Sequence, residues 1–210
     1  MEIKKPYLII CEGDSEFAYI QELNRFLNEQ GLPIVFIAHN AGGGGFKNLR
    51  QVCRALKTRR NGRTFIMADK DIYRRDDNGN GTMYENEKDT VPPFLFQTWN
   101  FEDFLLMHFP AEVISAWRVE AERSGHKAAP LHGSDYMPIF SLFCEGNKAA
   151  LNFMFPYEKG DVPFALTKQH IDQLLVNNTP NSFPHSAFAD MLSALMSLES
   201  GGRWLGRRSG

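Results

Sequence analysis

The 210-residue sequence predicts an α/β fold, in which a mostly parallel sheet is flanked by helices and followed by a mainly helical C-terminal extension. Two observations predict this fold. Short, continuous apolar runs recur in the first half of the chain, and such runs are typical of strands that are buried on both faces. Segments with apolar residues at helical spacing separate these runs, and strands that alternate with helices form parallel βαβ units.

The first unit combines a strand at residues 7–11 with a helix. Ser15 is a suitable N-cap, and Gly31 followed by Pro33 ends the helix. Between them, five apolar residues recur at helical spacing: Phe17, Ile20, Leu23, Phe26 and Leu27. A second short strand is expected at residues 34–38.

The next unit begins with a glycine turn at residues 42–45 and a helix at about 46–56. A third buried strand follows at residues 64–68. Residues 74–90 are polar and rich in Asp, Asn and Gly, which predicts a loop. Another apolar run predicts a fourth strand at residues 94–98.

Three further helices are expected at residues 101–108, 110–123 and 188–198. Apolar stretches at residues 137–143 and 151–155 indicate additional folded structure, although their pattern does not define its elements.

These patterns divide the chain into three parts. We expect an α/β domain at residues 1–110, a helical extension at 111–200 that packs on it, and a flexible basic tail at 201–210.

Composition restricts the class of protein. The formal net charge of -2 does not by itself indicate a nucleic-acid-binding protein, so local charge must supply any such surface. The three cysteines are widely spaced, which favours neither a disulfide framework nor a zinc ribbon and predicts a reduced, cytoplasmic protein. No apolar stretch reaches the roughly 18 residues that a membrane span requires.

Three acidic residues follow two of the predicted strands. Glu12 comes directly after the first strand, and Asp69 and Asp71 come after the third. Ligands of parallel α/β sheets bind beyond the carboxyl ends of the strands, so these carboxylates are expected to meet at one edge. Acidic residues at loop starts also cap helices, and a lone DxD pair is weak evidence for a metal site.

Carboxylate oxygens are the ligands that Mg²⁺ prefers in proteins, and Mn²⁺ accepts the same donors. A cation held by Glu12, Asp69 and Asp71 polarises a phosphoryl oxygen and activates water. The three residues are therefore candidate catalytic residues and metal ligands for hydrolysis of a phosphodiester. Asp14 and Glu16 either assist a second cation or favour the start of the helix.

The same residues resemble a known domain. Residues 9–16, IICEGDSE, are similar to the opening strand and glutamate of TOPRIM domains, and residues 68–71, ADKD, are similar to their DxD motif. More narrowly, the chain resembles the RloB-like family of TOPRIM proteins from bacterial restriction and phage-defence loci, which are related to the OLD-type TOPRIM nucleases. The glycine turn at residues 42–45 and the segment NFEDFLLMHF at residues 100–109 match that family's pattern. Asp103 and Phe104 replace its usual apolar-Trp pair.

This resemblance covers residues 7–109 and implies a TOPRIM-like, Rossmann-like fold and a Mg²⁺- or Mn²⁺-dependent endonuclease in anti-phage defence. It implies that Glu12 is an acid/base or metal-linked carboxylate and that Asp69 and Asp71 are metal ligands. Glu102 is implied as an auxiliary ligand, whereas its position near a helix start equally suits a carboxylate beside the helix dipole. The resemblance also implies an ATPase partner. The alternative is a TOPRIM module without turnover that binds nucleic acid or this ATPase.

A basic stripe supplies a candidate surface for nucleic acid, either DNA or RNA. Four basic residues step by three and four along the helix at 46–56 and its end: Lys47, Arg50, Arg54 and Lys57. Such a stripe holds phosphates without reading bases, and a solvated helix face has the same pattern. Arg74, just after the DxD pair, either neutralises a phosphate or pairs with nearby aspartates.

A second metal hypothesis concerns residues 76–87, DDNGNGTMYENE, which fit the calcium-loop pattern with Glu87 at the twelfth position. A strand rather than a helix lies upstream, so a surface loop is the alternative. His108 ends an apolar helix and is expected to be a core residue. The sequence leaves the oligomeric state open, a homo-oligomer included.

Overall fold

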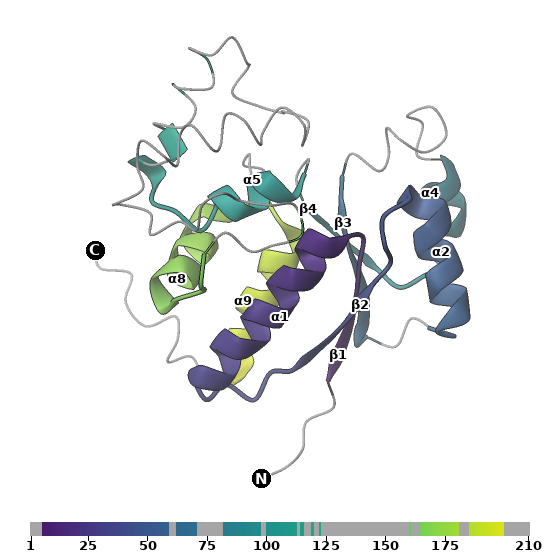
Figure 1. Cartoon of the computed structure of the whole chain (residues 1–210), viewed down its shortest axis with the longest axis horizontal. Helices are drawn as coiled ribbons and strands as arrows, with labels where there is room; N and C mark the ends of the chain where they lie inside the picture. Colours follow the sequence, from purple (N-terminus) through teal and green to yellow (C-terminus); the bar gives the residue numbers. More distant parts are fainter. Residues whose placement is uncertain are drawn as a thin grey trace.

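A computed structural model describes residues 6–58, 62–70, 82–97, 100–112, 114–115, 119, 122, 160, 164–180 and 185–199. Strands and helices alternate along its first half, and the helices α8 and α9 follow in the described part near the C-terminus (Figure 1). In chain order the elements are β1 (Tyr7–Cys11), α1 (Asp14–Glu29), β2 (Phe36–Asn40), α2 (Gly45–Ala55), β3 (Thr64–Asp69), α4 (Thr82–Glu87), β4 (Phe94–Gln97), α5 (Phe101–Leu106), α8 (Lys168–Asn177) and α9 (Ala187–Glu199).

The four strands form one all-parallel sheet with the order β2-β1-β3-β4. Tyr7 pairs with Phe36 at the start of β2, and Asp69 pairs with Gln97 where β3 and β4 end. The structure therefore confirms the α/β class and the parallel sheet flanked by helices.

The sheet order creates a switch point between β1 and β3. From β1 the chain crosses to β2 on one side, and from β2 it crosses back over β1 to reach β3. In open α/β sheets, ligands bind in the crevice that such a reversal leaves at the carboxyl ends of the strands. Glu12 directly follows β1 and Asp69 ends β3, so both residues lie at this point.

Each face of the sheet has its own hydrophobic core. On one face, Ile9, Cys11, Met67 and Leu95 join α1, α5, α8 and α9 in the larger core. On the other face, a smaller core lies beneath α2 and α4 and contains Ile10, Phe46, Leu49, Cys53, Ile66, Ala68, Val91 and Phe94. Figure 1 shows α2 and α4 on the opposite side of the sheet from α1, α8 and α9.

The C-terminal helices share the larger core. Ile171 and Leu174 of α8 and Phe188 and Leu192 of α9 are fully buried in it, together with α1. The predicted helix at residues 188–198 is confirmed, because α9 spans Ala187–Glu199. Helix α8 was not predicted, since only two of its ten residues are buried and its apolar pattern is correspondingly weak.

The second strand lies two residues later than predicted. Apolar residues suggested 34–38, whereas β2 spans Phe36–Asn40. The Asn24 side chain fixes its start, since the amide accepts a hydrogen bond from the Phe36 nitrogen at 2.9 Å and donates one to the Phe36 carbonyl at 2.7 Å. The polar residues His39 and Asn40 belong to the strand because they pair with Ile10 and Cys11 of β1.

The loop predicted at residues 74–90 is wrong in part, because Thr82–Glu87 form helix α4. Tyr84 explains this helix. Its ring lies edge-on to Phe94, with 4.9 Å between ring centroids, and also contacts Phe46 and Phe96. A single aromatic residue thus attaches the segment to the smaller core.

Several expectations fall where the structure is not described. Within the predicted helix at 110–123, residues 111–112, 114–115, 119 and 122 are helical and the others lie outside the described part. The apolar stretches at 137–143 and 151–155 and the tail at 201–210 also lie outside it. No helix among the described residues has the length and apolar character needed to cross a membrane.

Candidate functional site

Glu12 joins the ends of two strands. Its carboxylate oxygen Oε2 accepts a hydrogen bond from the Asp69 backbone nitrogen at 3.2 Å. Its own backbone nitrogen donates to the Met67 carbonyl at 3.0 Å, so β1 and β3 remain paired up to this residue. The sequence-predicted neighbours Glu12 and Asp69 are thus brought together at the switch point.

The glycine turn packs against Glu12 from the side of β2. Gly43 donates a backbone hydrogen bond of 2.7 Å to the Glu12 carbonyl. All four residues of the turn have positive φ, from 71° to 87°, a conformation that favours glycine. The Asn48 side chain closes the turn by donating to the Ala41 and Gly43 carbonyls at 2.5 and 2.7 Å. These hydrogen bonds hold the turn against the end of β1, on the β2 side of the site.

Glu16 adds a second buried carboxylate from the first turn of α1. Its Oε2 accepts a hydrogen bond of 3.1 Å from the Gly13 backbone nitrogen. Burial is the main cause that raises the pKa of Glu16 to about 7, and the nearby carboxylates of Glu12 and Glu102 act in the same direction, against the hydrogen bonds that lower it. Proximity of the three side chains, each no more than 8% exposed, therefore destabilises the charged form of Glu16.

Helix α5 contributes Glu102 to the same edge of the sheet. Asn100 caps this helix, because its side-chain oxygen accepts a hydrogen bond from the Asp103 nitrogen at 3.1 Å. Glu102 and Asp103 are both buried in the first turn. Figure 1 shows that α5 and the start of α1 lie at the end of the sheet where the strands terminate.

The structure places some of the predicted site residues at the carboxyl edge of the sheet, and others lie outside the described part of the chain. Glu12, Asp69 and Glu102 all lie at the carboxyl edge, whereas Asp71 and Arg74 lie outside the described residues. Asp14 accepts a 2.5 Å hydrogen bond from the Asn40 side chain, so it links α1 to β2.

Sequence reasoning missed Asp103 and Gln97, which are buried at the same edge. The rule that selected Asp69, a polar residue where a parallel strand ends, also selects Gln97.

The described carboxylates do not by themselves complete a metal site. Within the described ranges, no three side chains of His, Cys, Asp or Glu are arranged closely enough to hold a metal ion. The donor chemistry nevertheless fits a hard cation, because the edge is lined with carboxylate and amide oxygens and Glu16 already shows the repulsion that a cation relieves.

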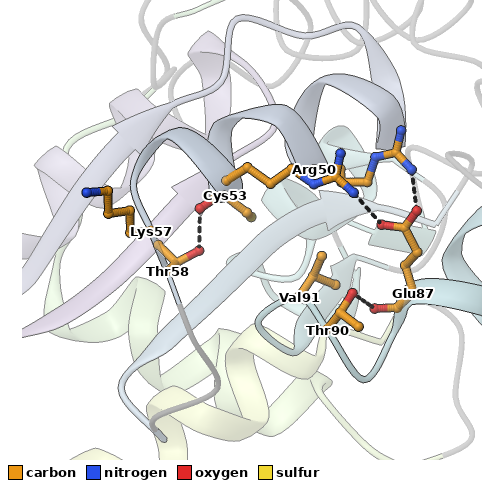
Figure 2. Close-up of a pocket in the computed structure, with 8 residues that line it drawn as sticks. Arg50, Cys53, Lys57, Thr58, Glu87, Thr90 and Val91 are labelled. Atoms are coloured by element: carbon orange, nitrogen blue, oxygen red, sulfur yellow. Dashed lines mark hydrogen bonds and ion pairs between the residues drawn. The ribbon is translucent and has the colours of Figure 1, made fainter.

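Three of the four residues of the basic stripe, all except Lys47, line a pocket on the face of the sheet opposite to α1 and α5. The pocket has a volume of about 510 Å³ and is lined by Arg50, Cys53, Arg54, Lys57, Thr58, Glu87, Thr90 and Val91 (Figure 2). Arg50 forms an ion pair with Glu87 of α4, and Figure 2 shows these two side chains pointing toward one another. Arg54 lies 3.9 Å from Glu87 and is 69% exposed. The pocket therefore has a net positive lining, with Arg50 already paired.

The Arg50 ion pair also bears on the calcium hypothesis. Glu87 would be the bidentate ligand at the end of a loop, but it instead ends helix α4 and its carboxylate pairs with arginine. Residues 76–81, which would supply the remaining ligands, lie outside the described part of the chain.

His108 is confirmed as a core residue. It is fully buried, and its Nδ1 lies 3.2 Å from the carbonyl oxygens of Phe104 and Leu105. Carbonyls only accept, so Nδ1 carries the proton and Nε2 accepts a 2.9 Å hydrogen bond from the Tyr19 hydroxyl. Burial, and to a smaller extent His170, lowers the pKa of His108 to about 3, so the ring is neutral and unsuited to proton transfer near neutral pH.

Comparison of the chain with protein-family models, curated protein sequences and solved structures finds no match.

Proposed function

We propose that this protein is a metal-dependent nuclease that hydrolyses phosphodiester bonds at the carboxyl edge of its sheet. The observation that carries the proposal is the hydrogen bond between the Glu12 carboxylate and the Asp69 backbone at the β1–β3 switch point. A hydrogen bond at this place holds two acidic residues, 57 positions apart in sequence, where α/β sheets bind ligands.

The residues available to hold a cation are Glu12, Asp69 and Glu102, with Asp71 expected from outside the described part. Bound Mg²⁺ or Mn²⁺ supplies a Lewis acid for a phosphoryl oxygen and activates water. Glu12 either moves a proton or binds the cation. Burial and the nearby carboxylates of Glu12 and Glu102 raise the pKa of Glu16 to about 7, so positive charge at the site would favour release of its proton.

The resemblance of residues 7–109 to RloB-like TOPRIM proteins supports the same activity and suggests a role in bacterial anti-phage or restriction-linked defence, with an ATPase as partner. The chain's own residues support the chemistry independently, because the buried carboxylates of Glu12, Glu16 and Glu102 lie near one another and would be favoured by a cation. Cytoplasmic location is part of this proposal.

The test is cleavage of DNA and RNA substrates with Mg²⁺ or Mn²⁺ by wild type, Asp69→Asn and the exposed control Asp89→Asn. Asp69→Asn leaves the Glu12 hydrogen bond intact, because that bond uses the backbone nitrogen of residue 69. The proposal predicts loss of cleavage in Asp69→Asn and full cleavage in Asp89→Asn. Equal cleavage by all three proteins excludes the site.

A second function is favoured by the basic pocket. Its positive residues lie on α2 and just after its end, on the opposite face of the sheet from Glu16 and Glu102, so it suits binding of nucleic acid without turnover. This alternative predicts that Asp69→Asn and wild type bind nucleic acid equally and that neither cleaves it at any concentration of Mg²⁺ or Mn²⁺.

A further inference from the structure

Gln97 lies at the candidate site, and its backbone is held by β3 on one side and by Ser186 on the other. It is the last residue of β4 and pairs in register with Asp69, the last residue of β3. Its carbonyl accepts a 3.1 Å hydrogen bond from the Lys70 nitrogen, and it forms an antiparallel bridge with Ser186. The sheet therefore fixes the backbone of Gln97 and the face from which its side chain projects.

The Gln97 side chain is buried without hydrogen bonds. Its exposed fraction is 0%, and neither the amide nitrogen nor the amide oxygen has a hydrogen-bond partner in the described structure. A buried amide normally finds partners, because desolvation without them destabilises the folded state. An orphaned amide of this kind points to a ligand, an ion or ordered water.

The register places Gln97 on the same face of the sheet as the acidic residues. Side chains at paired positions of neighbouring parallel strands project from the same face, about 4.8 Å apart. Met67 and Leu95, two residues before Asp69 and Gln97, lie in the core beneath α1, so Asp69 and Gln97 project to that same face. This face is the one that carries Glu16 and Glu102.

We propose that Gln97 is a further ligand of the divalent cation, bound through its side-chain amide oxygen. The inference rests on the proposed function, because it assigns a residue to that function's cation. An amide oxygen is a hard, neutral donor, so it binds Mg²⁺ or Mn²⁺ without adding negative charge to a site that already holds several buried carboxylates. Gln97 thereby contributes to selection of hard cations over Zn²⁺, which prefers nitrogen and sulfur ligands.

The experiment measures thermal unfolding of the full chain in a chelator and across a titration with Mn²⁺. It compares wild type, Gln97→Met, Asp69→Asn and the control Gln51→Met, which changes an exposed glutamine on α2. Gln97→Met should unfold at a higher temperature than wild type in the chelator, because it removes an unsatisfied buried amide. Its apparent Kd for Mn²⁺ should rise about 10-fold or more, the size expected when a metal site loses a supporting residue. Gln51→Met should match wild type in both measurements.

The outcomes separate this inference from the proposed function. If Asp69→Asn loses the Mn²⁺ response while Gln97→Met keeps the wild-type Kd, the role of Gln97 is refuted and the metal site stands. If wild type itself shows no Mn²⁺ response, both are refuted. Gln97→Glu provides a check independent of the methionine variant: it should unfold at a lower temperature in the chelator and bind Mn²⁺ more tightly, and unchanged Mn²⁺ affinity would overturn the inference.

Discussion

The carboxylate of Glu12 accepts a hydrogen bond from the backbone nitrogen of Asp69 at 3.2 Å, and this bond ties the end of β1 to the end of β3. Glu12→Gln keeps an oxygen that can accept this bond but removes the charge. If Glu12 moves a proton in the reaction, cleavage should fall about 10²–10⁴-fold. The melting temperature should stay close to that of wild type. Cleavage assays and thermal unfolding of the same preparation measure both, and an active Glu12→Gln would exclude a role for the charge.

Glu16 makes stability depend on pH. Its pKa is about 7 in the folded protein and 4.5 for an ordinary glutamate, so between these values the folded state binds more protons than the unfolded state. The free energy of unfolding contributed by Glu16 is therefore present below pH 4.5 and is lost as the pH rises through 7. Relative to wild type, Glu16→Gln should gain on the order of 1–3 kcal/mol at pH 8 and little at pH 4.

Stability must be compared between wild type and Glu16→Gln, because the titration of His108 changes stability with pH in the opposite direction. Its pKa is about 3 in the folded protein, so the unfolded chain binds a proton near pH 6.5 first and acidification destabilises the fold. Denaturant unfolding of wild type and Glu16→Gln at pH 4, 6 and 8 cancels this contribution. A stability difference that is the same at all three pH values would contradict the assignment to Glu16.

Tyr19 holds the buried imidazole of His108 through a 2.9 Å hydrogen bond to Nε2. Tyr19→Phe keeps the ring contacts with Phe104 but leaves Nε2 without its donor. We expect a loss of about 1–3 kcal/mol in the free energy of unfolding at pH 7, the cost of an unsatisfied buried acceptor. Denaturant titration measures it, and a variant as stable as wild type would show that this bond contributes nothing.

The basic pocket can be tested through the salt dependence of nucleic-acid binding. Lys57→Gln removes a charge that lines the pocket, so the slope of log affinity against log salt should fall by about one if Lys57 contacts a phosphate. Arg50→Gln is the comparison, because Arg50 already pairs with Glu87 and should change the slope less. Identical slopes for wild type and Lys57→Gln would remove this residue from the interface.

The order of strands and helices was predictable because burial on both faces of a parallel sheet produces continuous apolar runs, as in Tyr7–Cys11. The start of β2 was not, since it is set by a side chain twelve residues away, Asn24, rather than by local apolarity. Helix α4 was missed for a related reason. Tyr84 packs it on the smaller core, and a single aromatic residue in a polar segment produces no helical periodicity.

Sequence alone predicted only those site residues whose positions follow from the order of the parallel strands. Glu12 and Asp69 follow strands, and parallel strands end at one edge. The contribution of Glu16 depends on burial and on the carboxylates of Glu12 and Glu102, neither of which a linear pattern reveals. Gln97 fits the strand-end rule that selects Asp69, but it carries no charge and belongs to no motif. Its burial without hydrogen bonds, which marks it as a candidate ligand, is visible only in the structure.

The central claim is that the carboxyl edge between β1 and β3 binds a divalent cation. Anomalous diffraction from a crystal soaked in Mn²⁺ tests it most directly, because the peak locates the ion without assuming any activity. The account predicts a peak in contact with the carboxylates of Glu12 and Asp69 and its absence in Asp69→Asn. A well-diffracting crystal with no peak at this edge, or with Mn²⁺ bound only elsewhere, would contradict it.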